Sequence, residues 1–207
     1  MEFDPTGLST LELYKVLTGS ILPRPIAWVS TVDPSGQANL APFSFFTVAS
    51  VNPPILCFAP MLDDDRAEKH TLANIRQTGE FVVNIVSCDL VEQMNQTSAP
   101  YPSGVSEFTK AGVTPQASIL VRAPCVREAL IKFECTLRQV IGFGSEPMAG
   151  NLILGQICRI HLHPDIYRNG RVDGQVLDTV GRLAGNYYTT TRDRFELARP
   201  RLTEETS

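Results

Sequence analysis

Two neighbouring stretches decide the fold of this chain: Pro23–Thr31, which reads PRPIAWVST, and Asn39–Phe46, which reads NLAPFSFF. Successive side chains of an extended strand point to opposite faces, so the first stretch places Ile26, Trp28 and Ser30 on one face. Both of its faces run from apolar residues to a hydroxyl. The strand is therefore either a core strand whose hydroxyls cap the following DPSG turn, or the wall of a site for a flat ligand with a polar tail.

The second stretch is interrupted by Pro42, which cannot donate a backbone hydrogen bond to a neighbouring strand. A proline here predicts an edge strand, a bulge or an opening in the sheet. Asn39 and Ser44 add polar groups to a surface rich in phenylalanine, which is how small-molecule pockets are composed, although an edge without a ligand fits the pattern equally well. We also expect the phenylalanines at 43, 45 and 46 to form apolar surface that a monomer would expose, which indicates an interface or a ligand site.

The rest of the chain alternates many short β-rich runs with a few helical segments. Helical spacing and capping signals predict helices after the Ser9–Glu12 capping box, over 69–78 with Gly79 as its C-cap, and over 89–96. Antiparallel strands with tight turns, read as a meander from Pro25 onward, fit a closed or nearly closed barrel better than alternating strands and helices of a parallel sheet. We expect one domain over 1–207, with a core of about 14–163 and a looser segment at 164–207 that wraps the barrel or a partner subunit.

Composition excludes several function classes. Lys and Arg number 18 against 22 Asp and Glu, without a basic run, so we expect no nucleic-acid partner. No basic leader and no stretch of about 18 apolar residues appears, which predicts a cytoplasmic protein without a membrane span. The five cysteines are odd in number, widely spaced and set in apolar surroundings, which is typical of buried reduced thiols.

The stretch DDDRAEKHT introduces the helix predicted at 69–78 and offers a place for an anion. Arg66, Lys69 and Thr71 stand where the first amides and the dipole of that helix favour negative charge. The alternative is that these cations are solvated or pair with the acidic run Asp63–Asp65. The pattern alone leaves both open.

The remaining polar motifs give weaker evidence for a nucleotide, metal or catalytic site. The GFGSEP segment does not pass from a strand into a helix, so it predicts a turn and not a dinucleotide fingerprint. His161 and His163 share a strand face, yet no third ligand stands at a characteristic spacing, so we predict no metal site. Cys135 has no identified histidine base, and Glu134 alternates with Lys132 in a pattern typical of a solvated face.

Taken together, a series of motifs resembles the flavin reductase-like family, whose members have an FMN-binding split barrel and include flavoredoxins and reductase components of two-component monooxygenases. The resemblance spans residues 14–188 and is carried, in matching order, by LTGSILPRPIAWVST, NLAPFSFFTVASVNPP, KHTLANI, TGEFVVNIV, EQMN, SEFTKAGVTP, FECTL and GRLAGNYY. It implies a mainly β, Greek-key antiparallel split barrel with a few short helices. It also implies a homodimer with one FMN per subunit near the dimer interface.

The resemblance implies cofactor contacts residue by residue. The first strand would contribute Trp28, Val29, Ser30 and Thr31, and the second Asn39, Ala41, Pro42, Phe43 and Ser44. At the helix entrance, Lys69 and Thr71 match the phosphate-binding positions, Arg66 lies nearby, and His70 replaces the usual acidic residue. GRLAGNYY places Arg182 and Tyr188 near the flavin or the subunit contact.

The activity implied is that of an FMN-dependent oxidoreductase in which NADH or NADPH passes a hydride to flavin N5, without a catalytic side chain. The leading hypothesis is a NAD(P)H:flavin reductase that delivers reduced flavin to a partner oxygenase. The alternatives are a tightly FMN-bound electron carrier or flavoprotein oxygenase, and a non-catalytic flavin-binding module.

Overall fold

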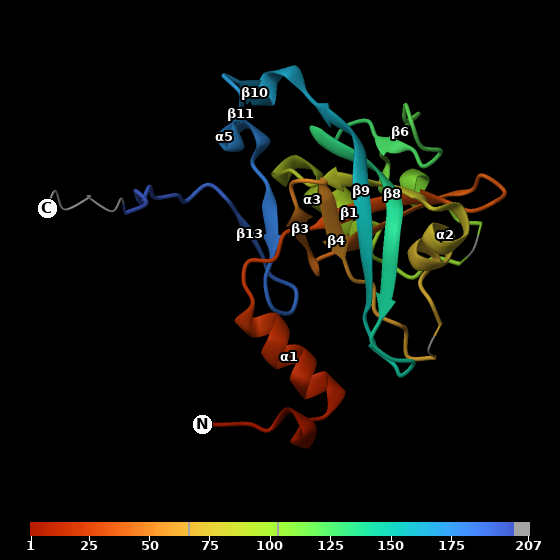
Figure 1. The fold of residues 1–207 in the computed structure, drawn as a ribbon, viewed down its shortest axis with the longest axis vertical. Coiled ribbons are helices and arrows are strands. Elements are labelled where there is room, and N and C mark those ends of the chain that lie inside the picture. Colours follow the sequence, from red (N-terminus) through yellow and green to blue (C-terminus); the bar gives the residue numbers. More distant parts are fainter. Residues whose placement is uncertain (66, 103, 201–207) are drawn as a thin grey trace, which may run out of the picture.

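One antiparallel sheet of seven strands organises the protein, in the order β2, β1, β5, β8, β9, β4 and β3 (Figure 1). The computed structural model describes every residue except 66, 103 and 201–207. The strands of this sheet are β1 (Ala27–Val32), β2 (Ala38–Phe43), β3 (Phe46–Ser50), β4 (Ile55–Phe58), β5 (Glu80–Ile85), β8 (Ile131–Gly142) and β9 (Asn151–Leu162). The prediction of a mainly β, antiparallel protein is confirmed.

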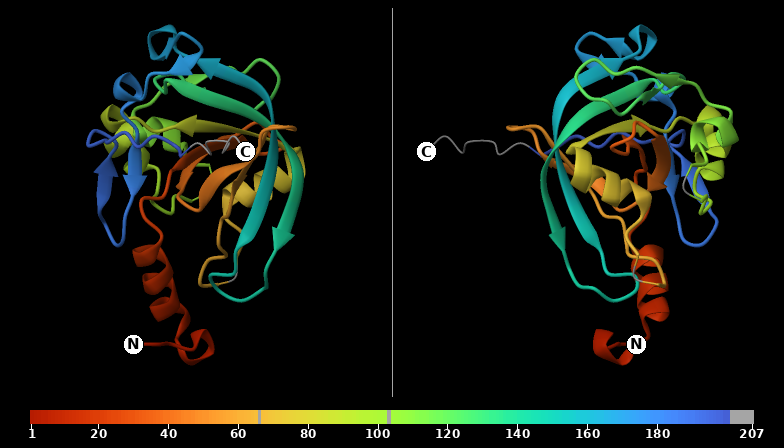
Figure 2. Two further views of the ribbon diagram at one scale, coloured as in Figure 1. Left: turned by 60° about the vertical axis from the view of Figure 1, so that its left-hand side comes forward. Right: turned by 90° about the vertical axis from the view of Figure 1, so that its right-hand side faces the viewer.

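The sheet curls until its two edges approach each other. β2 and β3 are the outer strands, yet only Ser44 and Phe45 separate them in the chain. Three peptide units span at most about 11 Å, so the end of one edge must lie near the start of the other. Figure 2 shows the resulting half-barrel. We call the gap between these edges the seam. A meander would pair β2 with β3. Instead β2 pairs with β1 and β3 pairs with β4, so the predicted meander is wrong at this point.

Strand β1 lies in the middle of the core and is buried along its whole length. The predicted alternation is confirmed: Val29 packs inside the barrel with Phe81, whereas Trp28 packs with Phe108 on the other face. The second face is covered by helices that follow β5 in the chain. Both faces are apolar because each one meets a separate hydrophobic cluster.

Helices are few and short. They are α1 (Thr10–Ser20), α2 (His70–Thr78), α3 (Val91–Gln96), α4 (Glu107–Ala111) and α5 (Gly174–Leu177), with 3-10 turns η1 (Pro5–Gly7), η2 (Cys88–Leu90) and η3 (Pro164–Ile166). The predicted capping box of α1 is present, and α2 ends at Gly79 with a φ of 71°. Helix α1 projects from the body of the barrel (Figures 1 and 2). No helix within the described part of the chain is long and apolar enough to cross a membrane.

The segment after His163 returns to the barrel and forms short pairs of its own. Its minor strands are β10 (Tyr167–Arg168), β11 (Arg171–Val172), β12 (Val180–Arg182) and β13 (Tyr188–Thr190). Two further minor strands, β6 (Pro115–Gln116) and β7 (Cys125–Val126), lie earlier in the chain. Thr179 bridges to Ser87, and Arg182 bridges to Arg24 just before β1. These bridges bring residues near the carboxyl end of the chain to one end of the seam.

Candidate functional site

A cleft of about 440 Å³ opens beside β2, the strand on one side of the seam. Small-molecule sites usually have volumes of about 300 to 1,000 Å³, so this cleft is large enough for a ligand. Several chain segments line it: Asn39 and Ala41–Phe45 from β2 and the residues after it, Lys69–Thr71 at the start of α2, Tyr14 of α1, the segment Thr97–Tyr101, and Glu107 of α4.

The outer edge of β2 presents backbone acceptors to this cleft. The Leu40 amide donates to Glu107 Oε2 at 3.2 Å, so the backbone of Leu40 faces away from β1. Backbone groups of an antiparallel strand alternate in direction, so Pro42 faces the same way. Proline has no N–H, and its carbonyl is left to meet a donor from a ligand. The prediction that Pro42 lies at a sheet edge is confirmed.

The start of α2 brings the ammonium group of Lys69 to the cleft, beside the carboxylates of Asp63 and Glu68. Lys69 is the N-cap and makes no side-chain hydrogen bond to the first turn. Its ammonium group forms an ion pair with Asp63, and both side chains are about half exposed. Thr71 Oγ1 accepts a hydrogen bond from Asn39 Nδ2 at 3.0 Å, which ties α2 to β2. The predicted contact Arg66 lies outside the described residues.

Glu107 is a buried carboxylate in the wall of the cleft, where sequence reasoning placed no functional group. Its side chain is 6% exposed, and burial raises the pKa of the carboxyl against the opposing effects of the Leu40 hydrogen bond and the nearby His70. His70 also lines the cleft. The position that carries an acid in related motifs therefore holds an imidazole here, and a carboxylate from α4 lies beside it.

The four predicted contacts from β1 lie behind the cleft and do not line it. Trp28, Val29, Ser30 and Thr31 are fully buried. Trp28 Nε1 donates to Thr97 Oγ1 at 2.9 Å, and both hydroxyls of the strand have hydrogen-bond partners within the protein. Their side chains match the core-strand interpretation, and contact with a cofactor stays a prediction.

A second cavity of about 660 Å³, which we call the adjoining chamber, shares Tyr14, Pro42, Ser44 and Ser98 with the cleft. Arg182 and Tyr188, predicted near the cofactor, line this chamber and not the cleft. The two cavities are therefore neighbours that meet at the residues they share.

Phenylalanine exposure differs from the prediction. Phe43 is 8% exposed and packs in the barrel interior, whereas Phe45 and Phe46 are half-buried. The expected apolar rim of three phenylalanines is therefore wrong for Phe43.

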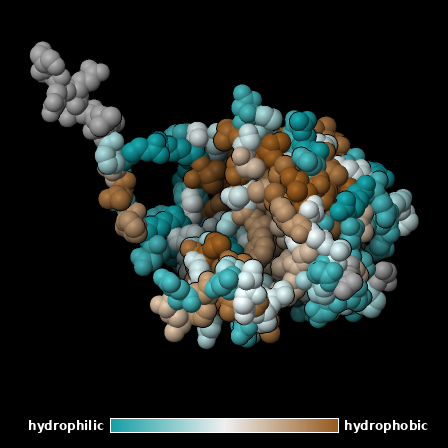
Figure 3. Space-filling view, turned by 60° about the horizontal axis from the view of Figure 1, so that its bottom comes forward, coloured by the Kyte–Doolittle hydropathy of each residue, from teal (hydrophilic) through white to brown (hydrophobic). Residues whose placement is uncertain are grey.

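Seen from the end that carries α1, apolar side chains lie on both sides of a hollow (Figure 3). The exposed large apolar residues of α1 and the turn after it are Leu11, Val16, Leu17, Ile21 and Leu22.

Glu134 is fully buried, so the prediction of a solvated face is wrong. Its Oε1 accepts from the Ile119 amide at 2.8 Å and meets His161 Nε2 at 2.6 Å, and its Oε2 accepts from the amides of Leu120 at 2.6 Å and Val121 at 3.2 Å. Burial by itself would raise the pKa of Glu134, but these hydrogen bonds outweigh it and hold the pKa below its usual value.

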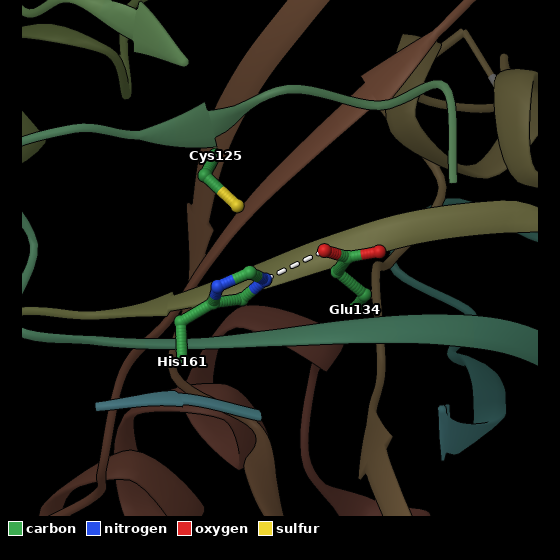
Figure 4. Close-up of side chains that lie close together, drawn as sticks. All are labelled: Cys125, Glu134 and His161. Carbon is green, nitrogen blue, oxygen red and sulfur yellow. Dashed lines mark hydrogen bonds and ion pairs between the residues drawn. The ribbon is translucent and has the colours of Figure 1, made fainter. Parts of the chain in front are cut away.

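Cys125, Glu134 and His161 come close together (Figure 4) and form the one set of three potential metal ligands in the part of the chain that the structure describes. A carboxylate has about four lone-pair directions, and four partners already occupy those of Glu134. The cluster is better explained as a clasp that holds the 119–121 backbone against β8. His163 is not part of it, because its ring accepts from the Asp165 amide in η3.

Comparisons with known proteins agree with this geometry. The family model described as "Flavin reductase like domain" matches residues 18–181. Nitrilotriacetate monooxygenase component B from Bacillus cereus is 36% identical, with a TM-score of 0.90 over 95% of this chain and 98% of that one. The 2-nitrobenzoate 2-nitroreductase NbaA from Pseudomonas fluorescens is 28% identical, with a TM-score of 0.88 and full coverage of both chains.

A third similar structure is a putative flavin reductase with a split barrel domain from Shewanella frigidimarina. It is 26% identical, with a TM-score of 0.82 over 97% of this chain and 100% of that chain. Together with the curled seven-stranded sheet, this likeness confirms the prediction of a split barrel.

Proposed function

The chain belongs to the flavin reductase-like family, and on that basis we propose that it is an FMN-dependent NAD(P)H:flavin reductase that supplies reduced flavin to a partner oxygenase. Membership in this family implies flavin binding in general. The cleft at the seam is the observation that carries the proposal for this chain, because it combines an apolar, acceptor-bearing strand edge with a cationic helix start.

The residues of the cleft fit a flavin mononucleotide. Lys69 and the first turn of α2 would hold the phosphate, since charge-assisted hydrogen bonds and the helix dipole both favour an anion there. The outward carbonyl of Pro42 would accept from a ring N–H, and Phe43 and Phe45 supply apolar surface beside it. A bound flavin supplies the redox chemistry by accepting a hydride from the nicotinamide. The protein binds and orients the reactants.

The test of reductase activity is anaerobic mixing of FMN-loaded protein with NADH and, separately, with NADPH. Loss of the flavin absorbance with either nucleotide is the expected result, and the faster one identifies the electron donor. If neither bleaches the flavin, the protein is a flavin-binding module without reductase activity.

A second candidate function keeps the flavin bound and reduces a small acceptor directly. The likeness to a structure named as a 2-nitrobenzoate 2-nitroreductase favours it. Steady-state NADH oxidation with and without added free FMN separates the two, because a flavin reductase turns over free flavin as a substrate. Nitrilotriacetate monooxygenase component B, by its name one part of a multicomponent system, supports the partner-oxygenase version.

We also propose that the protein is a homodimer, with helix α1 in the contact. The exposed side chains of Leu11, Val16, Leu17 and Ile21 place apolar surface on a helix that projects from the barrel. Such surface usually marks an interface or a ligand site. Light scattering at micromolar concentration should give about twice the chain mass of 22.8 kDa. A mass near one chain with flavin bound contradicts the dimer.

A further inference from the structure

The adjoining chamber contains two arginines and no acid. Arg24 and Arg182 line it together with Tyr14, Tyr188, Asn95 and Asn186. Within the described residues, no aspartate or glutamate contributes to its walls. Neither guanidinium belongs to an ion pair in that part of the chain. The chamber therefore has two positive charges that the protein does not neutralise locally.

The two arginines are direct cross-strand partners. The Arg24 amide donates to the Arg182 carbonyl at 3.0 Å, and the Arg182 amide donates back to the Arg24 carbonyl at 2.8 Å. Like charges directly opposite each other on antiparallel strands are destabilising. Burial is the main cause that lowers the pKa of Arg24, the Tyr14 phenol opposes it, and the charge of Arg182 lowers it further.

Arg24 is built into the wall and held rigidly. The residue is 6% exposed, and its guanidinium donates to the carbonyls of Thr18 at 2.6 Å, Ile21 at 2.9 Å and Leu183 at 3.0 Å. It also donates to Ser44 Oγ at 3.4 Å, which leaves one of its five N–H groups without a partner among the described residues. These carbonyls fix the orientation of the group without cancelling its charge. A buried cation that is hydrogen-bonded but has no counter-ion is suited to an anionic ligand.

Arg182 is positioned by a separate set of contacts. Its guanidinium lies over the Tyr188 ring, with Cζ 4.6 Å from the ring centroid, and donates to the Tyr188 hydroxyl and the Gly185 carbonyl. The Tyr188 hydroxyl in turn donates to Asn95 Oδ1 at 3.1 Å. Only two of the five N–H groups of Arg182 have partners among the described residues, which leaves donors for a ligand.

We propose that the adjoining chamber binds the phosphate or carboxylate group of the reactant that exchanges electrons with the cofactor in the cleft. This inference rests on the proposed function, because the two cavities share Tyr14, Pro42, Ser44 and Ser98 and a reactant spanning them would lie against the cofactor. The shared chemistry is an oxyanion held by two guanidinium groups. Its source is either the pyrophosphate of a nicotinamide dinucleotide or the carboxylate of an aromatic acid acceptor.

The test is titration calorimetry of the full chain with inorganic pyrophosphate and, separately, with benzoate. At least one anion should bind wild type. Arg182→Ala should weaken that binding by tenfold or more, about the effect of losing one charge-assisted hydrogen bond, and Arg182→Lys should recover part of the affinity. The matched control is Arg192→Ala, since Arg192 lies in the same segment but pairs with Asp178 outside the chamber.

A milder variant covers the case in which Arg182→Ala perturbs the fold. Tyr188→Phe removes the hydrogen bonds of the hydroxyl to Arg182 and to Asn95 and keeps the ring beneath the guanidinium, so a severalfold loss of anion affinity with only a small drop in melting temperature is expected. Pyrophosphate binding identifies the dinucleotide as the source, and benzoate binding identifies the aromatic acid.

Three results overturn the proposal: neither anion binds wild type, Arg192→Ala weakens binding as much as Arg182→Ala, or Arg182→Ala weakens FMN as much as the anion. FMN binding is measured in parallel by flavin fluorescence. Failure of FMN to bind any variant or wild type contradicts the proposed function, whereas the anion titrations decide the chamber separately.

Discussion

Removing the Lys69 ammonium should weaken FMN binding because that group is the cation at the phosphate end of the cleft. A hydrogen bond to a charged group contributes about 1.5 to 3 kcal/mol when well formed. The Lys69 side chain is 41% exposed and already pairs with Asp63, so solvent screening and the lost ion pair reduce the gain from a phosphate. We therefore expect Lys69→Ala to raise the dissociation constant of FMN by about tenfold, which corresponds to about 1.4 kcal/mol.

The assay is flavin fluorescence titration of FMN and riboflavin against the same protein samples. Riboflavin lacks the phosphate, so it should bind wild type weakly and respond little to Lys69→Ala. Lys110→Ala is the matched control, because Lys110 lies in the last turn of α4 and does not line the cleft. Asp63→Asn frees Lys69 from its ion pair and should tighten FMN binding severalfold.

Two outcomes refute this reasoning about the phosphate. Equal losses for FMN and riboflavin would show that Lys69→Ala damages the cleft in general. No loss for either ligand would remove Lys69 from the site. Raising the salt concentration should also reduce the difference between wild type and Lys69→Ala, because the charge is exposed and screened.

Three further predictions test packing, thiol environment and ligand linkage. Gly155→Ala should destabilise the protein by about 1 to 3 kcal/mol in urea denaturation, because a Cβ there would lie 2.1 Å from the ring of the fully buried Phe81; an unchanged midpoint contradicts this packing. Peptide mapping after brief native alkylation should show Cys158 labelled before Cys135, because burial raises the pKa of both thiols but Cys158 is exposed and Cys135 is buried; the reverse order would be inconsistent with this β8–β9 arrangement. FMN at one hundred times its dissociation constant should stabilise the fold by about 2.7 kcal/mol, and riboflavin at the same concentration by less.

Local signals were the part of the fold that sequence reasoning could predict. The Ser9 capping box, the left-handed Gly79 and the edge position of Pro42 each depend on a few neighbouring residues, and all three are confirmed. The crossing from β2 to β3 could not be predicted in this way. It depends on pairing between strands far apart in sequence, and the two intervening residues carry no signal for it.

The same limit explains what was missed at the candidate site. Alternation showed that Glu134 and Lys132 share a strand face, but it does not show what covers that face, and the 119–121 backbone folds over it. The expectation of five buried thiols is confirmed for Cys125 and Cys135 and is wrong for Cys158, which is exposed on β9; Cys57 and Cys88 are half-buried. Tyr14 lines both cavities, although nothing in the pattern of its helix marks it as a site residue. Its position facing the seam is a tertiary property.

The sequence carries no signal for the burial of Glu107, but it does carry one for the burial of Arg24. Glu107 is the first residue of the short helix α4, where an acid is ordinary, and only the structure shows that it is buried against the Leu40 amide. Arg24 lies between two prolines in PRP, directly before the core strand. A charged residue at the entrance of a fully buried strand must have polar partners, so its burial could have been suspected.

The buried Glu134 clasp leads to a prediction about stability and its dependence on pH. Glu134→Gln keeps the shape of the side chain but replaces one acceptor oxygen by an NH₂ group, which then faces backbone amides that are themselves donors. Hydrogen bonds to a charged acceptor contribute about 1.5 to 3 kcal/mol each, and breaking a buried network costs about 3 to 5 kcal/mol. We expect a loss of about 3 kcal/mol in urea denaturation at neutral pH. The matched control is Glu128→Gln, an exposed carboxylate whose two oxygens accept from the Thr114 amide, with an expected loss below about 1 kcal/mol.

The sign of the pH effect follows from the lowered pKa of Glu134 in the folded protein. The unfolded chain then binds the proton more readily, so this carboxylate contributes its full stability above the ordinary glutamate value of 4.5 and loses it as the pH falls through the lower folded value. The difference between wild type and Glu134→Gln should therefore be constant near neutrality and shrink progressively below about pH 4.5. His161 can donate to Glu134 either as the neutral Nε2–H tautomer or when protonated, so the contact persists across this range. A difference between the two proteins that grows as the pH falls, or a Glu134→Gln loss no larger than that of Glu128→Gln, would show that the buried carboxylate does not hold the 119–121 segment in place.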